Sequence, residues 1–510
     1  MSAQNPADVL LLNGQVLEGA GNPWVQRDIA ITGDRISFLG NARASRITAR
    51  DTLNVRGLLV TPGFWDVHSH ADLTSAHGRY ALPLLYQGVT TLVMGVDGDG
   101  TSEVRAMFDR YRQNGIAVNA VRYVGHGEAR GTVMGVADRA PTAAELTAMK
   151  AYIRKGMEEG AVGLSSGLFY SPGYFARTEE VIELAKVAAE YGGSYDTHDR
   201  DLGVAYQGIG YLNSIREGIR IGEEGGTPVI FSHFNAQGVQ WYGRAGEGAR
   251  LIDEARARGV NVVAGQHTYT ATNSSLSAYA LPRWAVVGGR EETNKRLRDP
   301  AIRTQLTRVV MEMLEPRGGP SKILFSDRRP DLNGKTLAAV ATGWNVSVPE
   351  AVMRIVSEGG ASVMNLDLYD DVNTRLLAQK DWMMTCTDGY TPADTTSISH
   401  PRSYGSFTKK LLMARADGLI SLPFAVRGMT SLPASFYGFG QRGSIAEGYF
   451  ADLAVFDLPR VRDLATYERP HQFSQGTVHV IVNGKLAFRD GRPTQVLAGR
   501  PLPRERGHAR

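Results

Sequence analysis

The chain has 510 residues, of which 43% are hydrophobic and 21% charged, with a formal net charge of +4 at pH 7. This composition excludes a mainly disordered chain, and the lack of both a run of about 18 apolar residues and a basic N-terminal leader predicts a cytoplasmic protein with no membrane partner. Basic residues are scattered, so no nucleic acid is expected as a partner, and the single cysteine, Cys386, excludes an internal disulfide and a thiolate zinc cage.

Short β-type runs, separated by Asn-Gly and Gly-Asp turns, stand near both ends of the chain. They cover residues 8–60 and, at the far end, residues 443–457 and 478–493. We expect these runs to form two parts of one small β-sandwich. Its first part falls in residues 1–61, and its second part, with the tail, in residues 431–510.

The middle of the chain, residues 62–430, alternates apolar runs with helix-like patterns. The amphipathic stretch 178–193, for example, ends at glycine, as a helix C-terminus prefers. This alternation predicts an α/β fold with a parallel (β/α)₈ TIM-type barrel. Residues 270–381 are too long for one crossover, so we expect an inserted subdomain between strands seven and eight that acts as a lid. The eight candidate strands are 63–70, 89–97, 118–125, 161–168, 193–200, 228–235, 260–269 and 382–388.

Polar residues fall where several of these apolar runs end. They are His68 and His70 in "DVHSH", Asp97 in "MGVD", His198 in "YDTHDR", His233 in "IFSHF" and Asp388 in "MMTCTDG". The carboxyl ends of barrel strands converge on one mouth, so we expect these six side chains to share one small volume. His68 and His70 lie two residues apart on a strand and therefore point the same way.

Each of these residues also has a plainer interpretation. A single histidine at a strand end is more often hydrogen-bonded than metal-bound, Asp97 also fits a glycine-rich turn, and Asp388 also fits a turn cap. Burying four imidazoles and two carboxylates without a cation is costly, however. The set therefore predicts one or two divalent ions, Zn²⁺ first, with Mn²⁺ and Fe²⁺ also compatible. Asp388 is then the expected catalytic residue, which orients a metal-bound hydroxide and passes its proton to a leaving nitrogen.

Four longer stretches resemble a known family. They are "PGFWDVHSHAD" (62–72), "GAVGLSSGLFYSPGYFARTEEVIELAK" (160–186), "ISHPRSYGSF" (398–407) and "MTSLPASFYGFGQRGSIAEGYFADLAVFD" (429–457). From about Ala7 to Arg500 the chain resembles the amidohydrolase superfamily, in its N-acyl-D-amino-acid deacylase (D-aminoacylase) branch. The resemblance implies a barrel beside a small β-sandwich. It also implies a zinc-dependent hydrolase that cleaves an acyclic amide, such as an N-acyl-D-amino acid or a related N-acyl compound.

The resemblance further implies roles for single residues. The metal ligands and the catalytic aspartate of the family match His68, His70, His198, His233 and Asp388. Arg402 matches an arginine that pairs with the substrate carboxylate, although a surface arginine in a loop is the plainer interpretation. Tyr269 and Ser275 match substrate-contacting positions, and packing alone also explains an aromatic residue at the end of strand seven.

The chain departs from this branch at several positions. Asp97 stands where the branch usually has a bridging cysteine, and Asn235 stands where it usually has a lysine. Strand four carries no lysine, which counts against the cyclic-amide branch. These differences leave open a bulkier or less anionic amide as substrate. They also leave open a cyclic-amide or lactam hydrolase, a deaminase of the same superfamily, or an inactive relative. The sequence does not fix the acyl group, the stereochemistry or the oligomeric state, a homo-oligomer included.

Overall fold

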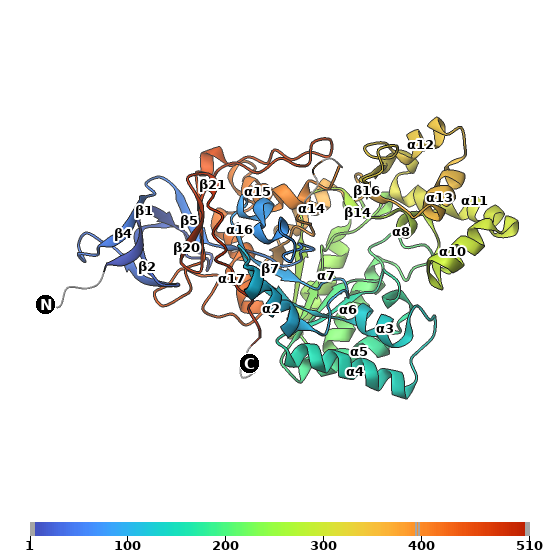
Figure 1. Cartoon of the computed structure of the whole chain (residues 1–510), viewed down its shortest axis with the longest axis horizontal. Helices are drawn as coiled ribbons and strands as arrows, with labels where there is room; N and C mark the ends of the chain where they lie inside the picture. The colour runs from blue at the N-terminus through green and yellow to red at the C-terminus, as the bar shows by residue number, and fades with distance from the viewer. Residues whose placement is uncertain (1–5, 393–394, 396–397, 505–510) are drawn as a thin grey trace.

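Three parts follow one another along the longest axis of the molecule (Figure 1). The computed structural model describes residues 6–392, 395 and 398–504. A sheet built from both chain ends lies at one end, the barrel lies in the middle, and the insertion lies at the other end. Within the described residues, no helix is both long and apolar enough to cross a membrane. The cytoplasmic location stays a prediction.

Parallel strands form the barrel. They are β6 (Phe64–Asp66), β7 (Val89–Met94), β8 (Asn119–Arg122), β9 (Val124–Gly125), β10 (Gly163–Gly167), β11 (Ser194–His198), β12 (Val229–Phe231), β13 (Val262–Gln266) and β17 (Met383–Thr385). One sheet has the order β6-β7-β8 and the other the order β17-β13-β12-β11-β10-β9. Tyr123 alone separates β8 from β9, and a parallel bridge between Ser69 and Gly389 joins the remaining edges. Each of the eight expected strands contains an observed one, so the predicted (β/α)₈ barrel is confirmed.

Both faces of the barrel strands are covered, which explains their apolar sequences. All six residues of β7 are buried, for example. The helices around the barrel are α1 (Leu82–Leu85), α2 (Val104–Asn114), α3 (His126–Met134), α4 (Ala143–Glu158), α5 (Thr178–Ala189), α6 (Tyr211–Gly225), α7 (Ala245–Ala257), α15 (Arg402–Arg415), α16 (Leu422–Met429) and α17 (Ser431–Phe436). In α5, acidic residues occupy the first turn and Val181, Leu184 and Ala188 are buried. The acidic turn favours the helix dipole, and each large buried aliphatic side chain contributes about 1.5–3 kcal/mol.

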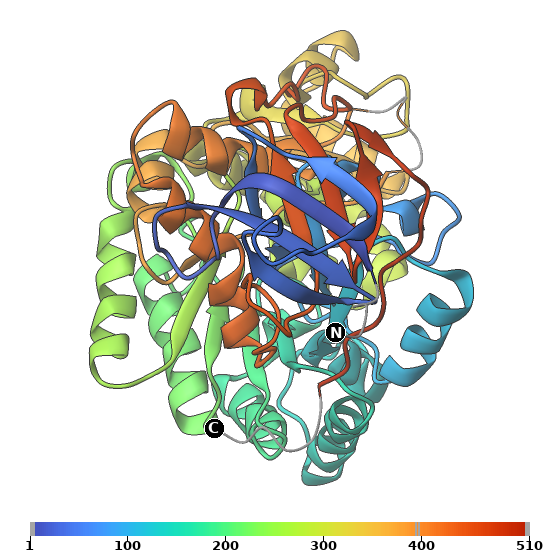
Figure 2. The same ribbon diagram turned by 90° about the vertical axis from the view of Figure 1, so that its left-hand side faces the viewer.

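Both chain ends contribute strands to one nine-stranded sheet, where the sequence predicted a β-sandwich, and this sheet lies over the barrel in Figure 2. Its strands are β1 (Ala7–Val16), β2 (Val25–Thr32), β3 (Arg35–Gly40), β4 (Ala49–Asn54), β5 (Leu59–Pro62), β18 (Leu453–Phe456), β19 (Thr477–Val482), β20 (Lys485–Arg489) and β21 (Arg492–Pro493). The two ends meet where β5 pairs antiparallel with β18. Leu11, Val60 and Ile481 share one apolar core there. The domain boundaries at residues 61 and 430 stay predictions.

The insertion between β13 and β17 has an apolar core of its own. Its three-stranded sheet has the order β14 (Thr272–Ser275), β16 (Ser362–Asn365), β15 (Ile323–Phe325). Its helices are α8 (Leu276–Ala280), α9 (Arg283–Val286), α10 (Gly289–Arg298), α11 (Pro300–Leu314), α12 (Leu337–Gly343) and α13 (Val348–Ser357). The next helix, α14 (Asp371–Leu377), packs on α7 and belongs to the barrel, although the sequence placed it in the insertion. The expected insertion is therefore present, and β14 places it beside the carboxyl end of β13.

Candidate metal centre and active site

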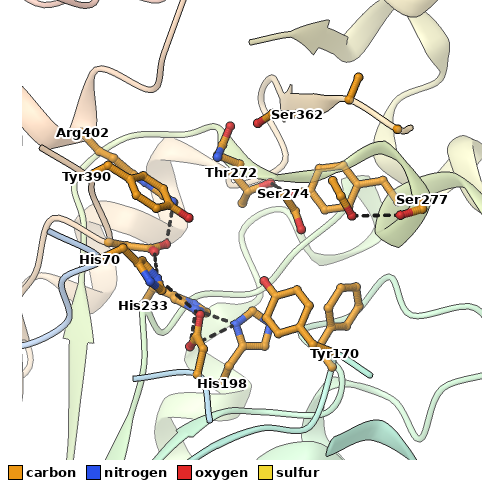
Figure 3. A pocket seen from close by; sticks show the side chains of 18 of the residues that line it. His70, Tyr170, His198, His233, Thr272, Ser274, Ser277, Ser362, Tyr390 and Arg402 are labelled. Carbon is orange, nitrogen blue, oxygen red and sulfur yellow. Dashed lines mark hydrogen bonds and ion pairs between the residues drawn. The ribbon is translucent and has the colours of Figure 1, made fainter. Parts of the chain in front are cut away.

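Six polar side chains meet at the carboxyl ends of five barrel strands, and Figure 3 labels three of them, His70, His198 and His233. They are His68, His70, Asp97, His198, His233 and Asp388. His68 and His70 follow β6, Asp97 follows β7, and His198 ends β11. His233 follows β12, and Asp388 follows β17. The structure thus brings together every residue that the sequence singled out as a metal ligand.

Asp97 lies between all four histidines. Its Oδ1 is 3.4 Å from Nε2 of His68, and its Oδ2 is 3.5 Å from Nε2 of His70. The same Oδ1 is 3.8 Å from Nδ1 of His198 and 4.0 Å from Nε2 of His233. These last two nitrogens lie only 2.7 Å from each other. The imidazole nitrogens therefore converge on one carboxylate.

Asp388 connects this cluster to Arg402. Its Oδ1 is 3.3 Å from Nε2 of His70 and 3.7 Å from Nε2 of His68. Its Oδ2 is 2.5 Å from Nη1 of Arg402, whose side chain is buried. Nη1 of Arg402 also lies 3.5 Å from Nε2 of His267. One carboxylate thus faces the histidines with one oxygen and a buried guanidinium with the other.

The charges of the cluster follow from burial and proximity. Burial lowers the pKa of His198 to about 3, helped by the neighbouring His233, and lowers the pKa of His233 to about 4. Both rings are therefore neutral at pH 7 and keep a nitrogen lone pair. Burial alone raises the pKa of Asp97, but the histidines, His68 first, outweigh it and hold that pKa well below its ordinary value. Arg402 and His233 likewise hold the pKa of Asp388 well below its ordinary value, against the effect of burial. Neutral imidazoles and ionised carboxylates are the forms that bind a metal, and His198 and His233 with the two aspartates are in these forms. Asp97 and Asp388 raise the pKa of His68 and His70 against the effect of burial, so these two rings lose a proton when a metal binds.

The backbone at these positions is unusual. Asp97 has φ 55°, His233 has φ 31° and Asp388 has φ 48°, although none of them is glycine. Side chains with a Cβ populate this left-handed region at a cost, and such residues cluster at functional sites. Three of the six residues of the cluster therefore hold a backbone conformation that costs free energy.

The donor set fits a divalent metal. Both ring nitrogens of His68, Oδ1 of Asp97 and Nδ1 of His233 are buried and make no well-aligned hydrogen bond among the described residues. Two overlapping triads, His68/His70/Asp388 and His68/Asp97/His233, each offer three ligand atoms within 4.8 Å of one another. A bound cation would supply the missing partners and offset the cost of burying these groups.

A cavity of about 640 Å³ opens above the cluster. Barrel residues form its floor, and the insertion supplies much of its upper wall, including Thr272, Ser274 and Ser362 (Figure 3). Ser275 lines the cavity, but its hydroxyl caps α8 and contacts Ser277. Tyr269 is not among the residues that line the cavity, and its hydroxyl donates to Asp463 at 2.6 Å. Of the expected substrate residues, Arg402 and Ser275 thus lie at the cavity and Tyr269 does not.

Several cavity residues were not expected from the sequence. Tyr170 packs on His198 with ring centroids 4.6 Å apart, and Tyr390 stacks on His70 at 5.2 Å. Asp99 lines the cavity, where burial and the charge of Asp97 raise its pKa to about 6. Tyr170 lies in the quoted stretch "GLFYSPG", which is the one local signal that marked it. Tyr390 stands two residues after Asp388, and Asp99 stands two residues after Asp97. Their closeness in sequence to these expected ligands was the one signal that could have indicated them.

Comparison with known proteins gives one family. The amidohydrolase family pattern matches residues 51–273 and 353–488 of the chain, and the gap between these two segments lies within the insertion. The chain is 32% identical to a D-aminoacylase of Alcaligenes xylosoxydans xylosoxydans, over 99% of each chain. It is 29% identical to an N-acyl-D-glutamate deacylase (98% of each chain) and 31% identical to an N-acyl-D-aspartate deacylase (96% of this chain, 95% of the relative) of the same organism.

Solved structures agree with this similarity. A crystal structure of D-aminoacylase matches with a TM-score of 0.82 and 30% identity, over 98% of this chain and 100% of the other. A D-aminoacylase structure of equal similarity has a binuclear metal centre, with activation by one metal and attenuation by the second. An N-acyl-D-glutamate deacylase from Bordetella bronchiseptica, in complex with zinc and a phosphonate that mimics the tetrahedral intermediate, matches with a TM-score of 0.81, 29% identity and coverage of 97% and 100%.

Proposed function

The chain belongs to the amidohydrolase family, and from this premise we propose that it is a metal-dependent hydrolase that cleaves the amide of an N-acyl-D-amino acid. One observation carries the proposal. Four histidines and two carboxylates converge beside a buried arginine in one cavity, in a chain that is similar over its full length to D-aminoacylase. A small-molecule amide is therefore the proposed partner.

We propose that one or two metal ions are held by His68, His70, Asp97, His198, His233 and Asp388. When bound, a divalent metal polarises the amide carbonyl and makes water reactive at neutral pH. Imidazole and carboxylate ligands favour Zn²⁺ and also accept Mn²⁺ or Fe²⁺. Zinc is our first choice because the N-acyl-D-glutamate deacylase structure contains it.

Asp388 is the proposed proton carrier. It is ionised before the reaction, so it can accept the proton of the attacking water and then donate it to the leaving nitrogen. Its ion pair with Arg402 and its contact with His70 fix both carboxylate oxygens. Arg402 is the proposed ligand of the substrate carboxylate, since its buried guanidinium retains Nε without a partner among the described residues.

The test of this function uses enantiomer pairs. We expect purified protein to hydrolyse N-acetyl-D-amino acids at least about a hundredfold faster than the L-forms, and to lose this activity when chelated. Adding back Zn²⁺, Mn²⁺ or Fe²⁺ in turn identifies the metal. Faster turnover of hydantoins, lactams or aminopurines would favour the cyclic-amide or deaminase alternative, and a metal content below half an ion per chain would favour the inactive relative.

Arg402→Ala is expected to raise KM for N-acetyl-D-amino acids by about a hundredfold, because a charge-assisted carboxylate contact of about 1.5–3 kcal/mol is lost. Arg402→Lys keeps the charge but not the planar fork, so we expect an intermediate KM. The measurement is steady-state kinetics on each amino acid and on its carboxamide, which lacks the charge. If the ratio of the KM for the carboxamide to the KM for the amino acid is the same in Arg402→Ala as in the wild type, Arg402 does not bind the substrate carboxylate.

A further inference from the structure

A second cavity, of about 470 Å³, adjoins the one above the metal cluster. The two cavities share part of their walls, which consists of a barrel loop after β10 on one side and the insertion on the other. The shared residues are Phe169, Tyr170, Ser275, Ser277, Gly359 and Gly360. A substrate arm that leaves the metal cluster in this direction would therefore reach the second cavity.

The proposed chemistry decides which arm that is. Asp388 donates to the leaving nitrogen and Arg402 binds the carboxylate of the amine half, and these two residues contact each other. Tyr170 packs on His198, away from Arg402 in the view of Figure 3. With the scissile bond over the cluster, the amine half lies toward Arg402 and the acyl half toward Tyr170. The acyl group is thus the arm that faces the second cavity.

The lining of the second cavity is apolar with two cationic side chains. Aromatic and aliphatic residues such as Phe175, Leu281 and Val356 form much of the wall, and its charged residues are Arg283 and Arg290. None of the described residues that line it is acidic. The first cavity differs, because Asp99 and Asp327 line it outside the metal cluster. Of the two cavities, only the second has charged side chains of one sign, and it therefore favours an anionic group.

Arg283 is fixed in place without a carboxylate partner. Its guanidinium lies 3.0 Å from the ring centre of Tyr174, and its Nη2 donates to the carbonyl of Phe169 at 3.2 Å. Its Nη1 makes no hydrogen bond within the described part of the chain, and neither Arg283 nor Arg290 forms an ion pair there. Burial lowers the pKa of Arg283 to about 10, so the group stays charged at neutral pH. A half-buried cation held by an aromatic ring and one carbonyl retains the capacity to pair with an anion.

We propose that the second cavity binds the acyl arm of the substrate, and that this arm is a dicarboxylic acyl chain whose distal carboxylate pairs with Arg283 and Arg290. This inference rests on the proposed function and narrows its substrate class. The apolar wall takes the methylene chain, and the arginines take the charged end. Ser277 lies on the wall between the cavities and is the position at which a larger side chain would obstruct the arm.

The experiment compares acyl chains on one D-amino acid. Succinyl, glutaryl and adipoyl derivatives are each assayed beside the butyryl, pentanoyl and hexanoyl derivative of matching length. We expect kcat/KM to favour at least one dicarboxylic chain by about tenfold or more. Arg283→Ala and Arg283→Gln should both remove most of this preference while uncharged chains keep their rates. Ser277→Leu should slow long chains of either kind more than it slows acetyl.

Arg298→Ala is the matched control, because Arg298 is an exposed arginine of the same insertion that lines neither cavity. It should leave the preference unchanged. Equal rates for charged and uncharged chains, or an unchanged preference in a folded Arg283→Gln protein, would overturn the inference. Hydrolysis of N-acetyl-D-amino acids by the wild type tests the proposed function separately. If the wild type does not hydrolyse them, both the proposed function and this inference are contradicted.

Discussion

Asp388→Asn is expected to keep its metal and to lose at least about a thousandfold in kcat on N-acyl-D-amino acids. The amide cannot accept the proton of the attacking water or return it to the leaving nitrogen, and a general acid–base group contributes about 10²–10⁴ in rate. Metal is retained because the His68/Asp97/His233 triad does not include Asp388. The measurement is kcat together with metal content per chain.

Asparagine is the informative replacement because it keeps the shape beside Arg402. Asp388→Ala would leave that buried guanidinium without its partner, at a cost of about 3–5 kcal/mol in stability. Asp99→Asn, which removes a carboxylate from the same cavity, is the control and should change kcat less than threefold or so. Equal losses of activity and metal in Asp388→Asn would identify Asp388 as a ligand only. A kcat within tenfold of the wild type would remove its proton-transfer role.

The barrel was predictable because strands buried on both faces appear as continuous apolar runs. The run "VTTLVM" is all buried in β7, and strand seven, "VVAGQ", is likewise all buried in β13. Strand ends were less predictable. The sequence pattern predicted that strand six covers residues 228–235, whereas the observed strand β12 ends at Phe231. His233 has a left-handed backbone there, which aims its ring at the mouth and ends the regular pairing.

Strand alternation also failed to place the residues after β13. In a strand, residues 267 and 269 would point to the same face. The strand β13 ends at Gln266, however, so alternation no longer applies to these two residues. In the structure His267 lies near Arg402, whereas the hydroxyl of Tyr269 reaches Asp463, nearly two hundred residues along the chain. No local pattern encodes a contact of that separation. The family resemblance selected Tyr269, whereas the residue that contacts Arg402 is His267, two positions earlier.

The cavity walls were the least predictable part of the site. The sequence indicated an insertion and its position, but its sheet arises from pairing between β14 and β16, which lie about ninety residues apart. That pairing brings Ser275 and Ser362 opposite each other. The second cavity depends in addition on where α9 and the loop after β10 meet. Such long-range packing sets the wall without leaving a periodic signal in the chain.

Asp97→Asn is expected to lower metal affinity by about a hundredfold or more, and activity with it, because a shared ionised ligand is lost. Asp97 is the carboxylate within 4.0 Å of a nitrogen of each of the four histidines. A neutral amide in that position leaves the cation with less compensating charge. The measurements are metal content after dialysis and kcat over a series of added metal concentrations.

The expected response to added metal separates the two aspartates. Asp97→Asn should regain part of its activity when metal is in excess, because the proton carrier Asp388 is intact. Asp388→Asn should regain none, because its metal is already bound. Asp97→Cys is a second comparison, since a thiolate of similar size should restore zinc binding and disfavour Mn²⁺. Full metal content and full activity in Asp97→Asn would mean that the histidines hold the metal alone and that Asp97 is only a turn residue.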